Sequence, residues 1–239
     1  MNNLMFAVIP FLPLIAIGGG VGGIFLLGCG LYLAFWRKHD YLLTGFSAAG
    51  KTTLVDALYD LWKHGKRRTS KQLLPSTPTL KAYSVKLRSR TFFHCTLHDD
   101  SGNLESRRND AYEFFIENAL MDTKKYSIIY VVDLTSINKT EIKRHIKSEL
   151  CQLEDVVIKK KNGMNKNIDK IEMIIVGSHY DLLDGKQKYE ISKQFRGLFA
   201  EYLSSDCFSP KYILADLISD EGCKRFANEL FETKKYGGV

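Results

Sequence analysis

The chain has 239 residues, of which 45% are hydrophobic, and its formal net charge is +7. No pair of its five cysteines has the spacing of a metal or redox site, which favours free thiols in a reducing compartment: Cys29, Cys95, Cys151, Cys207 and Cys223. No nucleic-acid-binding module accompanies the basic residues, so nucleic acid is not an expected partner. Attraction of the basic runs to an anionic membrane surface, or plain solvation of loops, accounts for the charge instead; these runs are Lys63–Arg68, Lys124-Lys125 and Lys159–Lys161.

An apolar segment occupies the N-terminus. Residues 4–36 are almost wholly apolar, and a stretch of roughly 20 such residues crosses the hydrocarbon core of a bilayer. Pro10 and Pro13 divide the segment, so the spanning helix is expected from about Leu14 to Trp36. A basic run begins at Arg37, and the positive-inside rule therefore places the remainder of the chain in the cytosol. A cleaved signal peptide would need a basic start and a small-residue cleavage site, and neither stands out here.

Two parts are therefore expected in a single-pass membrane protein. Residues 1–36 form an N-terminal transmembrane anchor, and residues 37–239 form a cytosolic domain. The expected membrane is that of the endoplasmic reticulum or a bacterial inner membrane.

A phosphate-binding loop comes directly after the first predicted strand. The spacing G-x-x-x-x-G-K-[ST] stands between an apolar run, Tyr41–Thr44, and an amphipathic segment that begins at Leu54. Strand, loop and helix in this order are the context that the motif requires. A chance glycine-rich turn would not need to stand in this context. Lys51 would place its charge on the β- and γ-phosphates, and the Thr52 hydroxyl would ligate Mg²⁺. The predicted nucleotide contacts are Gly45, Phe46, Ser47, Ala48, Ala49, Gly50, Lys51, Thr52 and Thr53.

The rest of the chain alternates between strands and helices. The expected strands are Lys81–Leu87, Arg90–Leu97, Ser127–Asp133, Glu172–Gly177 and Tyr212–Ala215. The expected helices run from about Lys51 to Gly65, around Ala111 to Ala119, from Lys139 to Val157, from about Lys186 to Leu203 and from about Asp220. Residues 66–79 and Lys159–Lys170 are expected to be loops. This alternation predicts an α/β fold with a mainly parallel sheet.

Two further motifs narrow the kind of nucleotide. Asp99 ends a predicted strand, and Gly102 completes a D-x-x-G, in which the carboxylate would hold Mg²⁺ through water and the glycine N–H would contact a γ-phosphate. Asp181 comes after another predicted strand. A carboxylate there would accept hydrogen bonds from the N1–H and the exocyclic amine of guanine, which adenine does not offer.

These motifs resemble those of the Ras-like small GTPases, and within them the Arf and signal-recognition-particle-receptor β-subunit group. Residues 48–53 look like the Arf version of the loop, Pro78-Thr79 like its switch I Pro-Thr, and Val131–Asp133 like its fourth strand. The resemblance covers Tyr41 to the C-terminus. It implies a P-loop NTPase (Ras-like) three-layer fold with a mostly parallel six-stranded sheet, preceded by one transmembrane helix. An N-terminal membrane helix fused to such a domain is similar to the receptor β-subunit, which anchors a soluble partner at the endoplasmic reticulum.

The resemblance also implies GTP or GDP with Mg²⁺ as ligands, and it assigns roles in hydrolysis. Thr79 is the expected switch I ligand of Mg²⁺, with Thr77 as the nearby alternative. Asn103 stands where many members place a water-orienting glutamine. Because asparagine is one methylene shorter, hydrolysis is expected to be slow or to depend on a partner. The expected catalytic residues are Lys51, Asn103 and Thr79, and the expected metal ligands are Thr52, Thr79 and Asp99.

The base-reading motifs depart from the family pattern. Ser178 and His179 replace the usual Asn-Lys before Asp181, and His179 could stack on the base through its ring. The fifth motif is degenerate, and there Leu217 would offer a backbone N–H to guanine O6. We count Gly102, Ser178, His179, Asp181 and Leu217 among the nucleotide-binding residues.

The predicted function is that of a membrane-anchored GTP-binding protein. It would hydrolyse GTP slowly and act as a nucleotide-dependent switch that recruits a cytosolic protein partner, whose identity the sequence does not give. One alternative is a nucleotide-gated anchor with negligible hydrolysis, which Asn103 and the weak fifth motif favour. Another is a P-loop ATPase.

Overall fold

The computed structural model describes residues 38–46, 48–67, 110–123, 126–164, 169–203 and 206–232, and the backbone of residues 81–88 and 92–99. All of them belong to the unit Lys38–Val239. The predicted anchor, residues 1–36, lies outside the described residues, as do Ser47, Thr77, Thr79, Gly102 and Asn103. In the part of the chain that is described, no helix combines the length and the apolar character needed to cross a membrane.

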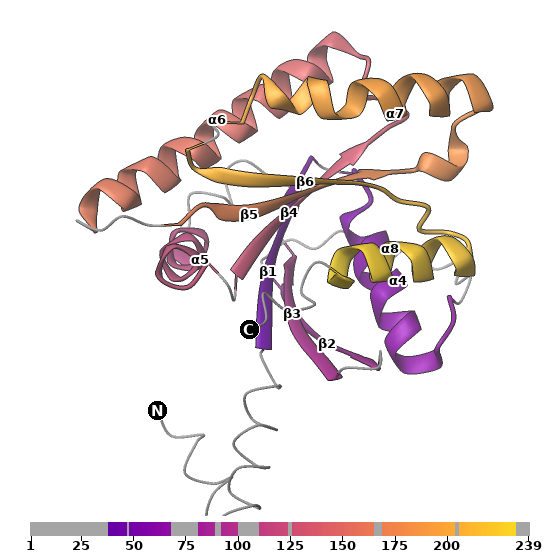
Figure 1. Ribbon diagram of the computed structural model, residues 1–239, viewed down its shortest axis with the longest axis horizontal. Helices are drawn as coiled ribbons and strands as arrows, with labels where there is room; N and C mark the ends of the chain where they lie inside the picture. The colour runs from indigo at the N-terminus through magenta and orange to yellow at the C-terminus, as the bar shows by residue number, and fades with distance from the viewer. Residues whose placement is uncertain are drawn as a thin grey trace, which may run out of the picture. The chain divides into compact units, whose positions relative to one another are not determined.

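One sheet organises the described residues. It has six strands in the order β2-β3-β1-β4-β5-β6 (Figure 1). The strands are β1 (Lys38–Gly45), β2 (Lys81–Arg88), β3 (Phe92–Asp99), β4 (Tyr126–Asp133), β5 (Ile171–Ser178) and β6 (Phe208–Leu214). β2 pairs with β3 in antiparallel fashion, and the other neighbouring strands pair in parallel. The predicted mostly parallel six-stranded sheet is confirmed.

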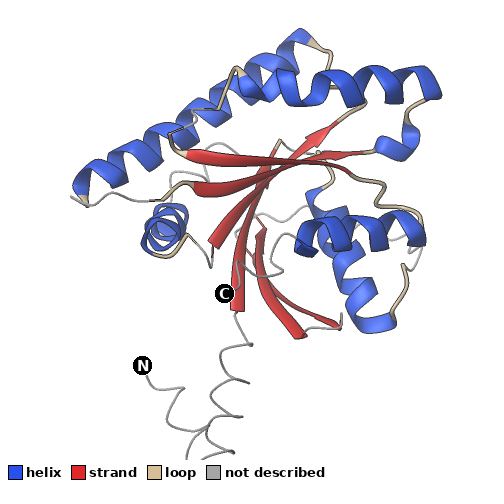
Figure 2. Cartoon of the chain, viewed as in Figure 1, coloured by secondary structure: helices blue, strands red, loops and turns tan. Residues whose placement is uncertain are grey.

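Helices cover both faces of this sheet (Figure 2). They are α4 (Lys51–His64), α5 (Asp110–Met121), α6 (Thr140–Gly163), α7 (Gly185–Ala200) and α8 (Asp220–Glu232), with a short 3-10 turn, η3 (Tyr180–Leu182). α4 and α8 pack on one face, and α5, α6 and α7 on the other (Figure 1). The arrangement is a three-layer α/β fold.

The central strands have apolar side chains on both faces because both faces are buried. In β4, Ile128 and Tyr130 belong to the core beneath α5, α6 and α7. Ile129 and Val131, which alternate with them, belong to the core beneath α4 and α8. All four are at most 2% exposed. The continuous apolar run that predicted this strand is the direct result of its two buried faces.

The C-terminus of α4 and the N-terminus of α7 have ordinary helix caps. α4 ends at His64, and Gly65 takes the left-handed conformation with φ 68° while its N–H donates to the Leu61 carbonyl. α7 begins after Asp184, whose carboxylate accepts from the Gln187 N–H at 2.8 Å while the Gln187 side chain accepts from the Asp184 N–H at 3.1 Å. This reciprocal pair is a capping box.

Two element boundaries differ most from the sequence expectation. α6 continues through Gly163. The expectation of a loop from Lys159 to Lys170 is therefore wrong for residues 159–163, which are helical. Lysine is a good helix former, and Lys160 on this last turn lies 3.2 Å from Glu113 and 3.6 Å from Glu117 of α5. β6 begins at Phe208, earlier than expected, although it contains Pro210. Proline is tolerated there because β6 is an edge strand.

The cysteines that the structure describes are free thiols, as predicted: Cys151, Cys207 and Cys223. Cys223 lies in α8 and is 0% exposed. Burial raises the pKa of its thiol to about 11. This sulfur therefore stays protonated at neutral pH and behaves as a core residue.

Candidate nucleotide-binding site

The predicted site residues gather at the carboxyl ends of neighbouring strands. In the sheet register, Leu43 pairs with Asp99 of β3, Gly45 with Val131 of β4, and Gly177 of β5 with Leu214 of β6. The loops after these strands therefore emerge at one edge. In open α/β sheets, this is the edge at which ligands bind.

The loop after β1 has a backbone that requires its glycines. Gly45 has φ 131°, and a Cβ there would lie 2.2 Å from the Val131 carbonyl oxygen, so no side chain fits. Gly50 has φ 88°, in the left-handed region that favours glycine. The turn between them is closed by the Ala49 N–H, which donates to the Phe46 carbonyl at 3.2 Å. Both glycines of the motif are thus explained by the shape of the loop.

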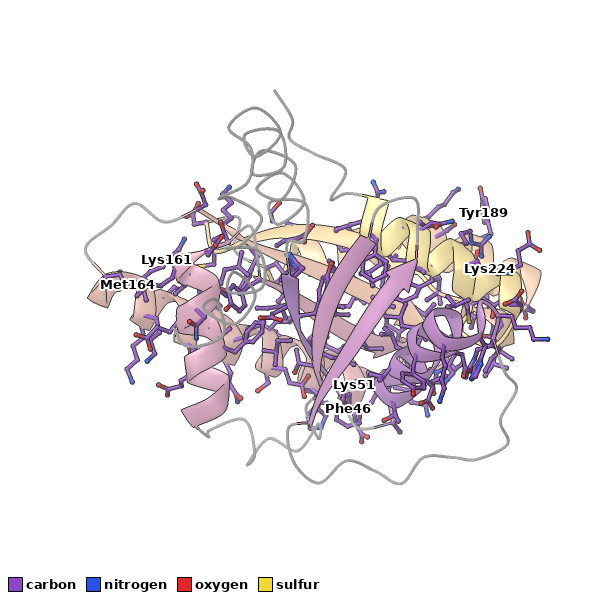
Figure 3. All side chains as sticks on the ribbon, turned by 90° about the horizontal axis from the view of Figure 1, so that it is seen from below. Phe46, Lys51, Lys161, Met164, Tyr189 and Lys224 are labelled. Carbon is purple, nitrogen blue, oxygen red and sulfur yellow. The ribbon has the colours of Figure 1, made fainter. Side chains whose placement is uncertain are left out.

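Lys51 reaches back across this loop. Its ammonium donates to the Gly45 carbonyl at 2.8 Å and to the Phe46 carbonyl at 2.9 Å, and the residue is only 7% exposed. Figure 3 labels Lys51 and Phe46, which lie next to each other. No acidic residue occurs in the first turn of α4. A buried ammonium and the positive end of a helix dipole therefore meet at one point, and an anion is attracted there.

Ser178 ties the end of β5 to the same loop. Its hydroxyl lies 2.7 Å from the Ala49 carbonyl oxygen and 3.1 Å from the Val132 carbonyl oxygen, and the residue is 1% exposed. A hydroxyl has one hydrogen, so it donates to one of these oxygens at a time. The expected contact of Ser178 with nucleotide stays a prediction. What the structure shows is a hydroxyl that holds two loops together.

His179 is held by a residue that the sequence did not single out. Its backbone has φ 57°, which is uncommon for a residue other than glycine. Its Nδ1 lies 3.0 Å from Asp133 Oδ1, at the end of β4. A carboxylate only accepts hydrogen bonds, so Nδ1 carries the hydrogen and Nε2 is left for other partners. The available signal for its role was the position of Asp133, a charged residue directly after the apolar run Ile128–Val132.

Asp133 is charged at neutral pH. Burial by itself raises the pKa of its carboxyl, but hydrogen bonds from the Thr135 hydroxyl and N–H, together with His179, lower it below its ordinary value. The Thr135 contacts measure 2.7 and 2.9 Å. The anion therefore holds the imidazole of His179 in one orientation.

Asp181 has an unsatisfied oxygen. Asp181 lies in η3. Its Oδ1 is buried and has no hydrogen-bond donor among the described residues. The turn itself is fixed, because the Tyr180 N–H donates to Ala215 at 3.4 Å and the Leu182 N–H donates to His179 at 3.1 Å. A buried acceptor without a donor costs about 1–3 kcal/mol. A ligand that carries N–H groups would supply the missing donors.

The loop after β6 lies beside this turn. The carboxylate of Asp216 accepts from the N–H groups of Ile218 and Ser219, both at 3.0 Å, and from the Ser219 hydroxyl. The neighbouring Leu217 is 2% exposed and packs in the core beneath α4 and α8. None of these contacts of Asp216 uses the N–H of Leu217, the group predicted to reach guanine O6.

The predicted magnesium site is described in part. Thr52 lies in the first turn of α4, and Asp99 ends β3 next to Leu43 of β1. Among the described residues, no group of three or more His, Cys, Asp or Glu side chains could hold a metal ion. Magnesium in nucleotide sites keeps several waters and takes one or two protein oxygens plus phosphate oxygens. A hydroxyl residue and a carboxylate residue, at the start of α4 and at the end of β3, are residue types that suit that kind of site.

Comparison with solved structures identifies the fold. The Arl6 BBS3 small GTPase from Trypanosoma brucei, with bound nucleotide analogue GppNp, matches 82% of this chain and 96% of its own, with a TM-score of 0.53 and 14% identity. The chain has the fold of a small GTPase. The signal recognition particle receptor SRb-GTP/SRX complex from Chaetomium thermophilum gives a TM-score of 0.52 at 14% identity, over 81% of this chain and 97% of that one. No protein-family model and no curated protein matches the sequence.

Proposed function

We propose that this chain binds GTP and GDP and acts as a nucleotide-dependent switch that hydrolyses GTP slowly. The unsatisfied, buried oxygen of Asp181 carries the proposal, because Asp181 lies in the turn that follows Ser178, the residue that ties the end of β5 to the phosphate loop. The two similar structures support it, since one holds a GTP analogue and the other is described as a GTP form.

The phosphates would bind in the loop after β1. Backbone N–H groups from Phe46 to Thr53, including those at the N-terminus of α4, would donate to the phosphate oxygens. Lys51 would contribute the positive charge of its ammonium, which is hydrogen-bonded to carbonyls of this loop. Magnesium, when bound, neutralises charge on the β- and γ-phosphates, and Thr52, Thr79 and Asp99 would hold it. Asn103 would orient the attacking water, and its short side chain is the reason to expect a low rate.

The base would bind between η3 and the loop after β6. Asp181 would accept hydrogen bonds from the N1–H and the exocyclic amine of guanine, and the Leu217 N–H would donate to O6. Adenine has no N1–H and carries a donor in place of O6, so it would leave both groups unpaired. His179, held by Asp133 at 3.0 Å, would lie against the base or the ribose.

A membrane location and a protein partner belong to the same proposal. The apolar residues 4–36 support a single transmembrane anchor, and the basic run directly after them supports a cytosolic GTPase domain. The similar receptor chain occurs in a complex with SRX, which supports a partner protein for this chain as well. We propose the endoplasmic reticulum or a bacterial inner membrane.

A second candidate is a nucleotide-gated anchor in which hydrolysis is negligible. Asn103 and the degenerate fifth motif favour it. Single-turnover hydrolysis of GTP by the full chain in detergent separates the two functions. A rate equal to that of the Lys51→Ala variant would refute slow catalysis and leave the anchor.

Nucleotide specificity is the decisive test of the proposal. The full chain in detergent, loaded with fluorescent GDP, is competed with GTP, ATP and XTP. We expect GTP to compete and ATP to fail. In Asp181→Asn, the amide accepts N1–H and donates to the C2 carbonyl of xanthine, so the preference should move from GTP to XTP by at least about 100-fold.

The matched control is Asp184→Asn, three residues along. Asp184 caps α7 from an exposed position, and asparagine caps equally well. This variant should keep the wild-type preference for GTP. Equal competition by ATP and GTP with the wild-type protein would instead favour a P-loop ATPase.

A further inference from the structure

Arg67 is a largely buried arginine in the basic run Lys63–Arg68, which the sequence suggested to be a solvated loop or a membrane contact. It lies just past Gly65, the cap of α4, and its side chain is 9% exposed. Its guanidinium Nη1 lies 2.6 Å from Asp60 Oδ2 in α4, and that carboxylate is 15% exposed. Its Nε donates to the Leu217 carbonyl at 3.2 Å. This arginine thus points into the domain.

The backbone of Arg67 is bound as well. Its N–H donates to Asp220 Oδ1, in the first turn of α8, at 2.7 Å. Arg67 therefore joins three segments that are far apart in the sequence: the end of α4, the loop after β6 and the start of α8.

The contact with Leu217 fixes one peptide plane from both sides. The carbonyl oxygen of Leu217 accepts from Arg67, and the nitrogen of the same peptide, that of Ile218, donates to Asp216 Oδ1 at 3.0 Å. The Leu217 side chain is packed in the core beneath α4 and α8. With its side chain and its following peptide held, the position of the Leu217 nitrogen is restrained by these contacts.

We infer that Arg67 is a positioning residue for the guanine base. It holds the peptide that follows Leu217, so that the Leu217 N–H stays in place to donate to O6. The inference rests on the proposed function, because it assumes that guanine binds there. Arginine suits the task since its planar fork places separate donors on a carboxylate and a carbonyl, whereas lysine has one ammonium.

The alternative is that Arg67 is only a structural clamp. Its loss would then destabilise the domain without changing how the base is read. Arg67→Lys addresses this, because the ammonium can keep the pair with Asp60 and lose the separate donor to Leu217. Arg67→Met removes both contacts. The experiment must therefore measure the hydrogen bond to guanine O6 and the stability of the domain separately.

The test compares GDP with 6-thio-GDP, whose sulfur at position 6 accepts hydrogen bonds more weakly than oxygen. Dissociation of fluorescent GDP and competition by both nucleotides are measured on the full chain in detergent. The wild-type protein should prefer GDP over 6-thio-GDP. In Arg67→Lys and Arg67→Met, GDP should dissociate about tenfold faster, and the preference should shrink toward unity. The melting temperature of the nucleotide-free protein should fall in Arg67→Met far more than in Arg67→Lys.

Lys224→Met is the matched control. Lys224 pairs with Asp220 Oδ2 at 2.6 Å, so the substitution removes a positive charge from the same cluster without a contact to Leu217. It should leave the preference for GDP over 6-thio-GDP unchanged. A wild-type preference in both Arg67 variants, with lower stability or without it, would overturn the inference and leave the proposed function standing. A wild-type protein that binds no guanine nucleotide would overturn both.

Discussion

Replacing Asp181 by alanine should stabilise the nucleotide-free protein while it abolishes the binding of GDP. The reason is the buried Oδ1, which has no donor among the described residues. A buried, unpaired acceptor costs about 1–3 kcal/mol, and since the rest of this side chain is partly exposed we expect a gain near the lower end, about 1 kcal/mol. Binding sites often carry such a local cost because the ligand removes it.

Nucleotide should reverse the order of stability. At a GDP concentration of 100 times Kd, the wild-type protein gains about 2.7 kcal/mol from binding, and a variant that does not bind gains nothing. The variant should therefore be more stable without GDP and less stable with it.

Urea unfolding of the full chain in detergent, with and without GDP, measures both effects. Asp155→Ala, at an exposed position on α6, is the control and should stay within about 0.5 kcal/mol of wild type in both conditions. An Asp181→Ala variant that is less stable than wild type without nucleotide would show that Asp181 serves the fold, and the assignment to guanine would lose its basis.

Three further changes test the loops around the site. Gly45→Ala should prevent the loop after β1 from forming, since the new Cβ would lie 2.2 Å from the Val131 carbonyl oxygen, and circular dichroism with urea unfolding should show a loss above about 2 kcal/mol. Ser178→Ala should cost about 1 kcal/mol in the same assay and speed the release of fluorescent GDP, because the 2.7 Å bond to Ala49 is lost. For Asp216, burial alone raises the pKa, but hydrogen bonds from the Ser219 hydroxyl and from the Ser219 and Ile218 N–H groups lower it below its ordinary value. The stability that this carboxylate contributes is therefore complete above its ordinary pKa of about 4 and is lost as pH falls through the lower folded value. Asp216→Asn should accordingly lose less stability than wild type between pH 7 and pH 3, and an equal loss would contradict this reasoning.

Local patterns were enough to predict most of the fold. The strands at the centre of the sheet are buried on both faces, so each reads as a continuous apolar run, and β4 and β5 were predicted to within a residue at either end. The phosphate loop was predictable because its glycines are required by the local backbone conformation. Gly45 and Gly50 both have positive φ in the structure.

Contacts between distant segments were not predictable from one sequence. Asp133 meets His179 because β4 and β5 are neighbours in register, and nothing in either local sequence reports that pairing. Arg67 sits in a basic run, and only its fold partners, Asp60 and Leu217, turn it inward. The last turn of α6 was not predicted, because a lysine-rich segment is typical of a solvated loop. Its contacts with the glutamates of α5 are visible only in the structure.

The phosphate loop is early in the chain, but later segments complete it. Gly45 rests against Val131 of β4, and the carbonyl of Ala49 receives the hydroxyl of Ser178, which is 129 residues further on. At about 5–20 residues per second, a ribosome needs about 6 to 26 s to make that interval. During this time the Ala49 carbonyl lacks its donor, because Ser178 at the end of β5 has not been made, and loop closure over so long a separation makes this a slow contact to form. The proposed GTP binding therefore requires that β5 has been synthesised and has joined the sheet, and a nascent chain that ends before Ser178 should not retain GTP.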